Sequence, residues 1–338
     1  MEPLREFPAV ISLARIALLA AAVALAAGTA DAGNPKNDPN MIGNREVSKG
    51  VNFYSLEREM ALGKQLAQEV ERQSKILDDP IMSEYINRLG QNLARNSDAK
   101  VPFSFKIVDS EELNAFALPG GYVFVNSGLI KLADDECELA GALAHEIAHV
   151  AARHMTRQAT KAEIANLTTI PLSVLLGGVP GLVTRQAAGL AVPMTFLSFG
   201  RRDEAEADYL GLQYLYSAGY DPTGVISLFE KMESLERKEP GTIAKLFATH
   251  PMDSDRIHSA EKEIEEILPP KAEYVVTTSE YREMKDRLLA LQNKPKTGEQ
   301  ARPRPGASGA AEGVDDAGAK SGNLGASDPP AVGRELVE

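Results

Sequence analysis

Apolar residues recur every three or four positions along much of the chain, a period typical of helices that bury one face. The first such stretch spans residues 55–74. A second begins at Asp79-Pro80, where a capping residue precedes a proline suited to the first helical turn. Further helical patterns are expected over residues 134–157, 203–217, 222–238, 242–247 and 253–267. Residues 274–291 add a short strand and another helix, so a mainly helical chain is predicted.

Strand-like patterns are concentrated in one stretch after the second helix. Apolar and polar residues alternate over residues 103–108, as on a half-buried strand. Two more short strands, residues 114–118 and 122–126, flank Pro119-Gly120-Gly121, a sequence suited to a tight turn. We therefore expect a hairpin and a small sheet, and the predicted fold class is α+β, mainly α.

The N-terminal residues 1–32 have the pattern of a secretory signal peptide. Arg5 and Arg15 precede the apolar run of residues 16–27, and Ala30-Asp31-Ala32 fits a signal-peptidase site. An uncleaved N-terminal membrane anchor is the alternative interpretation. Export would place the protein in a bacterial periplasm or cell envelope.

Composition divides the rest of the chain. Residues 33–52, rich in Asn, Pro and Gly, are expected to be a flexible lead-in. Residues 294–338, rich in Pro, Gly, Ala and Ser, are expected to be a disordered tail. Between them, residues 53–270 should form one domain, followed by a short extension over residues 271–293. The part between leader and tail, roughly 240 residues, is long enough for one sizeable hydrophobic core.

An apolar segment at residues 164–199 interrupts the predicted domain. Its first part, residues 164–183, carries no charge and would suit a transmembrane span. However, Pro171, Gly177 and Pro180 divide it into pieces shorter than the ~20 residues that a bilayer requires. A buried or surface-associated apolar hairpin is therefore the favoured interpretation. If exposed, the segment would mark a contact with a membrane surface or a client protein.

The charge balance excludes one class of partner. Lys and Arg total 36 against 48 Asp and Glu, a formal net charge of −12. Nucleic-acid-binding proteins need basic surfaces, so no nucleic acid is expected among the partners. The single cysteine, Cys137, excludes an intrachain disulfide, so core packing, with or without a metal ion, must hold the fold.

The strongest chemical signal is an HExxH sequence, formed by His145, Glu146 and His149 in the apolar helix expected at residues 134–157. Residues four apart lie on one face of a helix, so both imidazoles can reach one metal ion. Glu146 can then take a proton from a water whose pKa falls to near ~7 at hydrolytic zinc sites. Two solvated histidines on an amphipathic helix are the alternative, but the chain has only five histidines. We expect one Zn²⁺ per chain.

Zinc needs at least one more protein ligand than these two histidines. Metzincins use a third histidine at a place that Met155 occupies in this chain. His154 points to roughly the opposite side of a continuous helix, so we expect it to be structural or exposed. Glu204, in the helix expected at residues 203–217, can be the third ligand, and Asp208 can accept a hydrogen bond from a ligand imidazole. On spacing alone, an ordinary acidic helix start is an equal alternative.

Four motifs in a fixed order make the chain resemble the HtpX/BepA/CAAX-prenyl-protease family of gluzincin metallopeptidases. The motifs are NAFALPGG at residues 114–121, HEIAHV at 145–150 with RH at 153–154, RRDEAEAD at 201–208, and THP at 249–251 with RI at 256–257. The resemblance extends over about residues 55–267. It implies a zincin-type domain with a small sheet beside the HExxH helix.

The resemblance also implies roles for single residues. Glu204 becomes the third zinc ligand, and Asn114 begins an edge strand that can pair with an extended substrate. In the periplasmic BepA-like branch, the residue that matches His250 can be a fourth zinc ligand that holds the enzyme latent. In other branches it is a catalytic group near the transition state, and a structural histidine beside a proline is the remaining alternative. Arg256 is implied to orient this loop or to bind a substrate carbonyl.

The chain also departs from parts of this family. It lacks the several clear membrane spans of the integral-membrane branches, and no tetratricopeptide repeat follows the catalytic motifs. The predicted function is a zinc-dependent endopeptidase of the cell envelope, which acts on misfolded or stalled envelope proteins. The alternatives are a latent, chaperone-like assembly factor with zinc locked by His250, and a membrane-anchored protease. Expected partners are protein or peptide substrates, and outer-membrane assembly machinery or a membrane surface contacted through residues 164–199.

Overall fold

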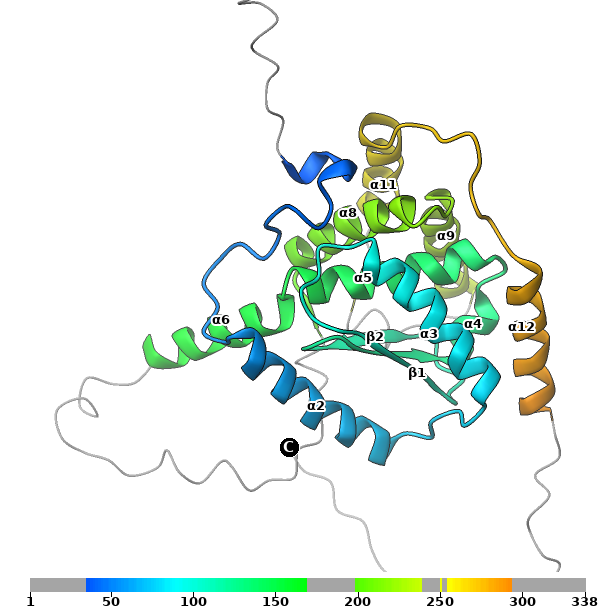
Figure 1. The fold of residues 1–338 in the computed structure, drawn as a ribbon, viewed down its shortest axis with the longest axis horizontal. Coiled ribbons are helices and arrows are strands. Elements are labelled where there is room, and N and C mark those ends of the chain that lie inside the picture. Colours follow the sequence, from blue (N-terminus) through cyan, green and yellow to red (C-terminus); the bar gives the residue numbers. More distant parts are fainter. Residues whose placement is uncertain (1–34, 169–197, 239–249, 251–253, 294–338) are drawn as a thin grey trace, which may run out of the picture. The chain divides into compact units, whose positions relative to one another are not determined.

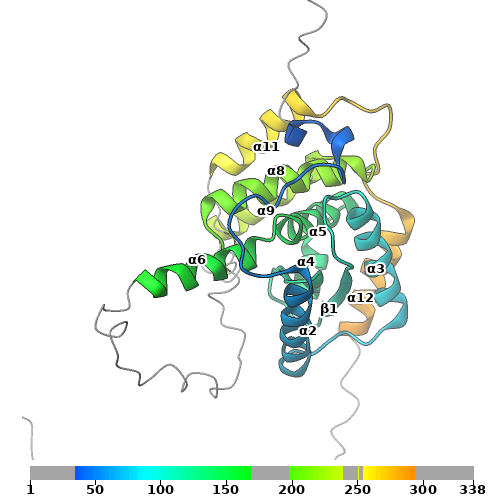
Figure 2. The ribbon, with the colours of Figure 1, turned by 60° about the vertical axis from the view of Figure 1, so that its left-hand side comes forward.

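The computed structural model describes residues 35–168, 198–238, 250 and 254–293, which are coloured in Figures 1 and 2. The predicted signal peptide, the helix expected at residues 242–247 and the C-terminal tail lie outside the described residues. In the described part, helices pack around one small sheet (Figure 1). The predicted α+β class with a predominance of helices is confirmed.

The sheet has three strands in the order β1-β3-β2. The strands are β1 (Ser104–Val108), β2 (Ala115–Leu118) and β3 (Tyr122–Asn126). β2 and β3 pair antiparallel, which confirms the predicted hairpin, and β1 runs parallel to β3. Gly120 and Gly121 in the hairpin turn have φ angles of 75° and 89°, a conformation that glycine adopts without strain. β2 is therefore an edge strand that ends at this turn.

Most of the described helices match the predicted stretches. They are α2 (Leu56–Gln73), α3 (Pro80–Arg95), α4 (Ser127–Leu132), α5 (Glu136–Ala151), α6 (His154–Thr168), α8 (Arg201–Ser217), α9 (Thr223–Lys238), α11 (Ser254–Ile267) and α12 (Ser279–Gln292). The carboxylate of Asp79 accepts a hydrogen bond from the amide of Met82, which makes it the N-cap of α3, as predicted. The N-cap of α2 is Ser55.

The expectation of a single continuous helix over residues 134–157 is wrong. α5 ends at Ala151, and α6 begins at His154 after a break in the chain direction. Arg153 lies in this break with a φ of 58°, which is unusual for a residue other than glycine. Its guanidinium donates hydrogen bonds to a carboxylate oxygen of Glu59 at 2.7 Å and to the carbonyl of Tyr54 at 2.6 Å. These tertiary contacts stabilise a break that no local Gly or Pro signals.

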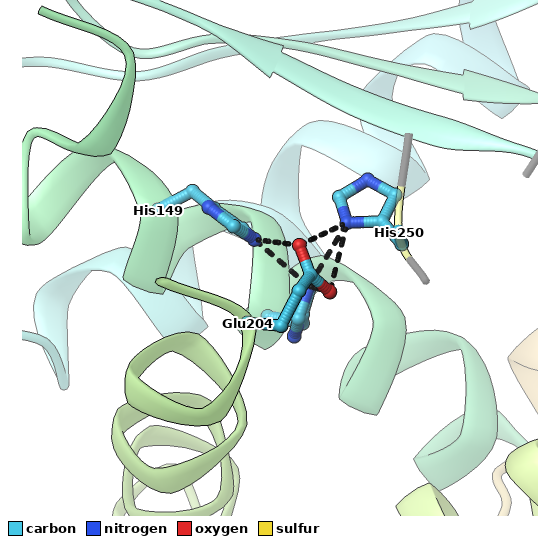
Figure 3. Close-up of side chains that lie close together, drawn as sticks. His149, Glu204 and His250 are labelled. Atoms are coloured by element: carbon cyan, nitrogen blue, oxygen red, sulfur yellow. Dashed lines mark hydrogen bonds and ion pairs between the residues drawn. The ribbon is translucent and has the colours of Figure 1, made fainter. Parts of the chain in front are cut away.

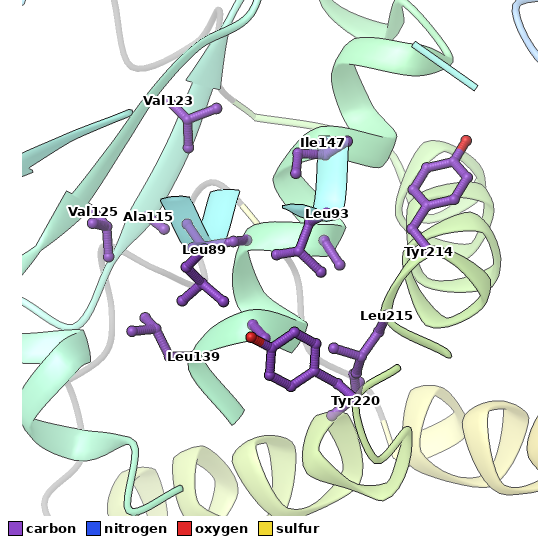
Figure 4. Close-up of a cluster of buried hydrophobic side chains, with 14 of the residues drawn as sticks. Leu89, Leu93, Ala115, Val123, Val125, Leu139, Ile147, Tyr214, Leu215 and Tyr220 are labelled. Atoms are coloured by element: carbon purple, nitrogen blue, oxygen red, sulfur yellow. The ribbon is translucent and has the colours of Figure 1, made fainter. Parts of the chain in front are cut away.

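The helix α5 lies at the centre of the hydrophobic core. Its residues Leu139 and Ile147 are fully buried. On one side of α5 lies the sheet with Val123, and on the other lies α8 with Leu215 (Figure 4). α8 approaches α5 closely at Gly211, where a Cβ atom would lie 3.0 Å from the Cα of His145. This approach brings the N-terminal half of α8 against the HExxH residues.

The lead-in is packed where the structure describes it, so the expectation of flexibility is wrong for residues 35–52. It forms two short 3₁₀ turns, η1 (Pro35–Asn37) and η2 (Pro39–Met41). Arg45 is buried, and its Nε donates a hydrogen bond to Asp98 at 2.8 Å. Val47 is 2% exposed and belongs to the main core. The apolar and ionic contacts outweigh the turn-forming composition of this segment.

The C-terminal extension contains the expected helix, α12, but the expected short strand is reduced to an isolated bridge. Val275 forms an isolated parallel bridge with Tyr220, and α12 packs against α3 and α4. Arg287 of α12 forms an ion pair with Asp79, the N-cap of α3, at 2.7 Å. This pairing ties the extension to the N-terminal half of the domain.

The apolar segment of residues 164–199 is described only at its two ends. Residues 164–168 complete α6, and residues 169–197 lie outside the described residues. The ring of Phe199 stacks on His149 with a centroid separation of 4.0 Å. Among the described helices, none combines the length and apolar character needed to span a bilayer. The membrane interpretation of the segment therefore remains a prediction.

Candidate metal centre

Four predicted metal ligands converge on one point in the structure, and Figure 3 labels three of them, His149, Glu204 and His250. Each of His145, His149, Glu204 and His250 offers one ligand atom, and these atoms all lie within 4.8 Å of one another. The Nε2 atoms of His145 and His149 are 3.0 Å apart. Nδ1 of His250 lies 3.1 Å from a carboxylate oxygen of Glu204, which in turn lies 3.5 Å from Nε2 of His149.

Three elements supply these side chains. α5 presents His145 and His149 one turn apart, as the spacing predicted. Glu204 lies in the first turn of α8, whose amide groups favour a negative charge there. His250 approaches from the other side, from the chain that precedes α11. The site therefore depends on the packing of α8 against α5.

The chemistry of the four donors fits a divalent zinc-type ion. Imidazole nitrogens and carboxylate oxygens are the common ligands of Zn²⁺ in proteins. Burial lowers the pKa of His149 well below its usual value, which keeps the ring neutral and able to bind a metal. Burial alone would raise the pKa of Glu204, but hydrogen bonds with His149 and His250 outweigh it and hold the pKa far below its usual range. Glu204 is therefore an anion at neutral pH.

Asp208 and Arg256 are charged residues that contact ligands of this centre. Asp208 Oδ1 lies 2.9 Å from Nδ1 of His145. Asp208 was predicted to accept a hydrogen bond from a ligand imidazole, and His145 is the imidazole that it approaches. Arg256 donates from Nε and Nη2 to the two oxygens of Asp208, at 2.7 and 2.6 Å. Its Nη1 lies 3.2 Å from Glu204, and its guanidinium sits 4.6 Å above the ring of Phe229. Arg256 thus contacts the carboxylates of both Glu204 and Asp208.

Glu146 points from α5 toward the edge strand and His250. Its carboxylate lies near the backbone of Ala117, and an oxygen lies 3.4 Å from Nε2 of His250. Burial raises the pKa of Glu146, and the charges of His250 and His145 offset only part of this rise. A raised pKa brings a carboxylate closer to the range in which it both accepts and returns a proton at neutral pH.

Asn114 immediately precedes the edge strand β2. Its backbone carbonyl accepts a hydrogen bond from the amide of Asn126 at 2.9 Å, which anchors the start of the hairpin. The side chain is buried, and its Oδ1 has no hydrogen-bond partner among the described residues. Buried polar atoms without a partner are uncommon in proteins, so this oxygen is an exception.

The sequence patterns did not reveal an apolar pocket beside this centre. The pocket opens next to His145, Glu146 and His250. Its apolar lining comes mainly from α5, α8 and α9 and includes Ala142, Leu212, Val225, Leu228, Phe229 and Met232. On α9 these residues look like an ordinary buried helix face, so their spacing alone does not separate a pocket wall from core.

His154 is the other residue whose surroundings were not predicted. It is fully buried, so of the two expected possibilities, a structural or an exposed histidine, the structure shows the buried one. The break between α5 and α6 brings its ring to 4.9 Å from that of His149, centroid to centroid. A continuous helix would have placed the two rings on different faces.

Comparisons with known proteins find proteases among the relatives of this chain. The model of Peptidase family M48 matches residues 80–264. The beta-barrel assembly-enhancing protease of Escherichia coli (strain K12) is 31% identical over 251 residues, which cover 71% of this chain and 50% of that protein. Metalloprotease LoiP of the same strain is 30% identical over 224 residues, 64% of this chain and 86% of LoiP. Mitochondrial metalloendopeptidase OMA1 of Schizosaccharomyces pombe is 32% identical over 187 residues, 55% of this chain and 52% of OMA1. The chain spans about half the length of the beta-barrel assembly-enhancing proteases that it matches.

Proposed function

This chain belongs to Peptidase family M48 and is thereby a metallopeptidase, and on that premise we propose that it is a zinc-dependent endopeptidase of the bacterial cell envelope. The observation that carries the proposal is the convergence of His145, His149 and Glu204, with Glu146 beside them. Two imidazoles, one carboxylate and an adjacent base form the constellation that zinc-dependent peptide hydrolysis requires.

Each residue of the proposed site has a separate task. Zn²⁺ held by His145, His149 and Glu204 would acidify a bound water and polarise the scissile carbonyl. Glu146 takes the proton of the attacking water and delivers it to the leaving nitrogen. The free edge of β2 pairs with the backbone of an extended substrate and positions it across the centre.

Two further assignments concern substrate binding. Asn114, whose side-chain oxygen has no partner at the start of β2, would bind a backbone amide of the substrate after a change of side-chain conformation that exposes it. Arg256 holds Glu204 and Asp208 in place. Its contact with a substrate carbonyl, implied by the family resemblance, would be an additional role.

Misfolded or stalled envelope proteins are the proposed substrates, and outer-membrane assembly machinery or a membrane surface is the proposed partner. The signal-like N-terminus supports an envelope location. The names of the relatives, which include a beta-barrel assembly-enhancing protease, support a substrate in outer-membrane assembly. Isolation of the protein from the periplasmic fraction after osmotic shock tests the location, and recovery only with membranes would favour the membrane-anchored alternative.

The apolar pocket predicts a preference for large apolar side chains beside the scissile bond. Burial of a Leu or Phe side chain contributes ~1.5–3 kcal/mol, so kcat/KM should be ~10- to 100-fold higher than for Ser or Asp at that position. Mass spectrometry of cleaved peptide libraries measures the preference. Val225→Phe, which fills the pocket, should weaken it, whereas Val276→Phe at an exposed position should not. Equal cleavage of polar and apolar sites would contradict this role of the pocket.

A latent form is the second candidate function, and the position of His250 favours it. Its Nδ1 lies 3.3 Å from Nε2 of His145 and 3.1 Å from Glu204, so it can be a fourth ligand in the place of water. A locked centre would leave the protein with a chaperone-like or assembly role and little turnover. Release of the latch by a client would then start proteolysis.

We expect His250→Ala to raise proteolysis of an unfolded protein above the wild-type level. The reason is that removal of a fourth ligand increases the fraction of molecules with an open coordination position. Initial rates of casein cleavage, at equal zinc occupancy, measure the effect. A fall in rate would instead place His250 in the reaction itself, as a catalytic group near Glu146.

A further inference from the structure

We propose that His154 and Glu206 form a hydrogen-bonded relay that orients His149 toward the metal centre. The inference rests on the proposed metal site and adds two positioning residues to it. Neither residue offers an atom to the four-ligand cluster. They act instead on the side of the His149 ring that faces away from the other ligands.

The three side chains form a chain of close polar contacts. Nδ1 of His149 lies 3.0 Å from Nδ1 of His154. Nε2 of His154 lies 3.1 Å from a carboxylate oxygen of Glu206. The planes of the two imidazole rings are inclined at 75°. His154 is 0% exposed, so bulk solvent does not reach its ring nitrogens.

One arrangement of protons gives each ring nitrogen of His149 and His154 a bonding partner. If Nε2 of His149 binds the metal through its lone pair, Nδ1 must carry the proton and needs an acceptor. Nδ1 of His154 is that acceptor, and its Nε2 then carries a proton that it donates to Glu206. Glu206 thereby fixes the tautomer of His154, and His154 fixes the tautomer and the ring orientation of His149.

The break between α5 and α6 builds this relay. His154 follows His149 by five residues, and in one continuous helix the two side chains would diverge. Arg153 in its left-handed conformation, held by Glu59, turns the chain so that His154 comes back against His149. The stacked ring of Phe199 covers another side of His149 and leaves it little freedom to rotate.

A second metal site is a less suitable interpretation of the same residues. Ligand atoms of His154, Asp203 and Glu206 also lie within 4.8 Å of one another. However, Glu206 already receives Lys36 at 2.6 Å and Arg157 at 3.1 Å. These two cations offset its charge and oppose the approach of a further cation. The surroundings therefore favour an acceptor for His154.

The test is the affinity of the metal-free protein for Zn²⁺, measured by competition with a chromophoric chelator. His154→Leu should lower the affinity ~10- to 100-fold, the usual cost of losing an outer hydrogen-bond partner of a ligand histidine. In His154→Asn, the side-chain oxygen can replace Nδ1 as acceptor, so the loss should stay below about fivefold. Glu206→Ala, which alters a partly exposed residue, should lower the affinity by a smaller factor than His154→Leu.

Controls separate positioning from folding. His258→Leu changes an exposed histidine and should leave the affinity unchanged. Thermal unfolding of each metal-free variant, followed by circular dichroism, shows that the compared proteins are folded. Wild-type affinity in His154→Leu, or an equal loss in His154→Leu and His154→Asn, would overturn the relay. A wild-type protein that binds no zinc would overturn the metal site itself.

Discussion

Replacement of Glu146 by Gln should abolish nearly all proteolysis while zinc stays bound. The amide cannot take a proton from the attacking water, and general acid–base catalysis of this kind contributes ~10²- to 10⁴-fold to the rate. Gln fits the same volume and keeps a side-chain oxygen near the backbone of Ala117. Initial rates of casein cleavage and the zinc content of the purified proteins measure the two halves of this prediction.

The matched control for this experiment is Glu84→Gln, an exposed position on α3. It should cleave casein at the wild-type rate. Unchanged cleavage by Glu146→Gln would contradict the proposed mechanism. Every other carboxylate that the structure describes near the metal centre already serves as a ligand or supports one, so none of them could replace Glu146 as the base. Loss of zinc together with activity would instead show that Glu146 shapes the metal site.

Replacement of Glu204 by Ala should remove most of the affinity for zinc. The change deletes a direct ligand, so the loss should exceed the ~10- to 100-fold that follows from losing an outer partner. Arg256 keeps its two hydrogen bonds to Asp208, so the metal-free variant is expected to remain folded. Equilibrium dialysis against Zn²⁺ measures the affinity, and proteolysis should fall in step with zinc occupancy.

Glu84→Ala serves as the control for this second change and should bind zinc as the wild type does. A Glu204→Ala variant with full zinc affinity would exclude Glu204 as a ligand. The centre would then depend on His145, His149 and His250 alone. That outcome would favour the locked form over the hydrolytic one.

Periodicity predicted most helices because their stability depends on one buried face. The strands and hairpin were predictable for a similar reason, since alternation and Pro119-Gly120-Gly121 act locally. The break at Arg153 was not predictable, because its cause is an ion pair with Glu59, more than ninety residues away. The packing of the lead-in through Arg45 and Asp98 has the same kind of cause.

The metal-binding pattern was easier to predict than the features around it. The four-residue spacing of His145 and His149 indicates a metal site, and Asp208 follows Glu204 by one helical turn. His250 could be connected with them only through the family resemblance, because no local period relates residues a hundred positions apart. The relay and the apolar pocket needed the tertiary structure, since each depends on side chains from several helices.

The most direct test of the proposed function is a structure of the zinc-bound protein with anomalous scattering at the zinc edge. We expect one ion within ~2.0–2.2 Å of Nε2 of His145, Nε2 of His149 and a carboxylate oxygen of Glu204. A fourth contact to His250 would identify the latent form, and an open fourth position the active one. An ion bound elsewhere, or none at this centre, would contradict the proposal that this chain is a zinc-dependent endopeptidase.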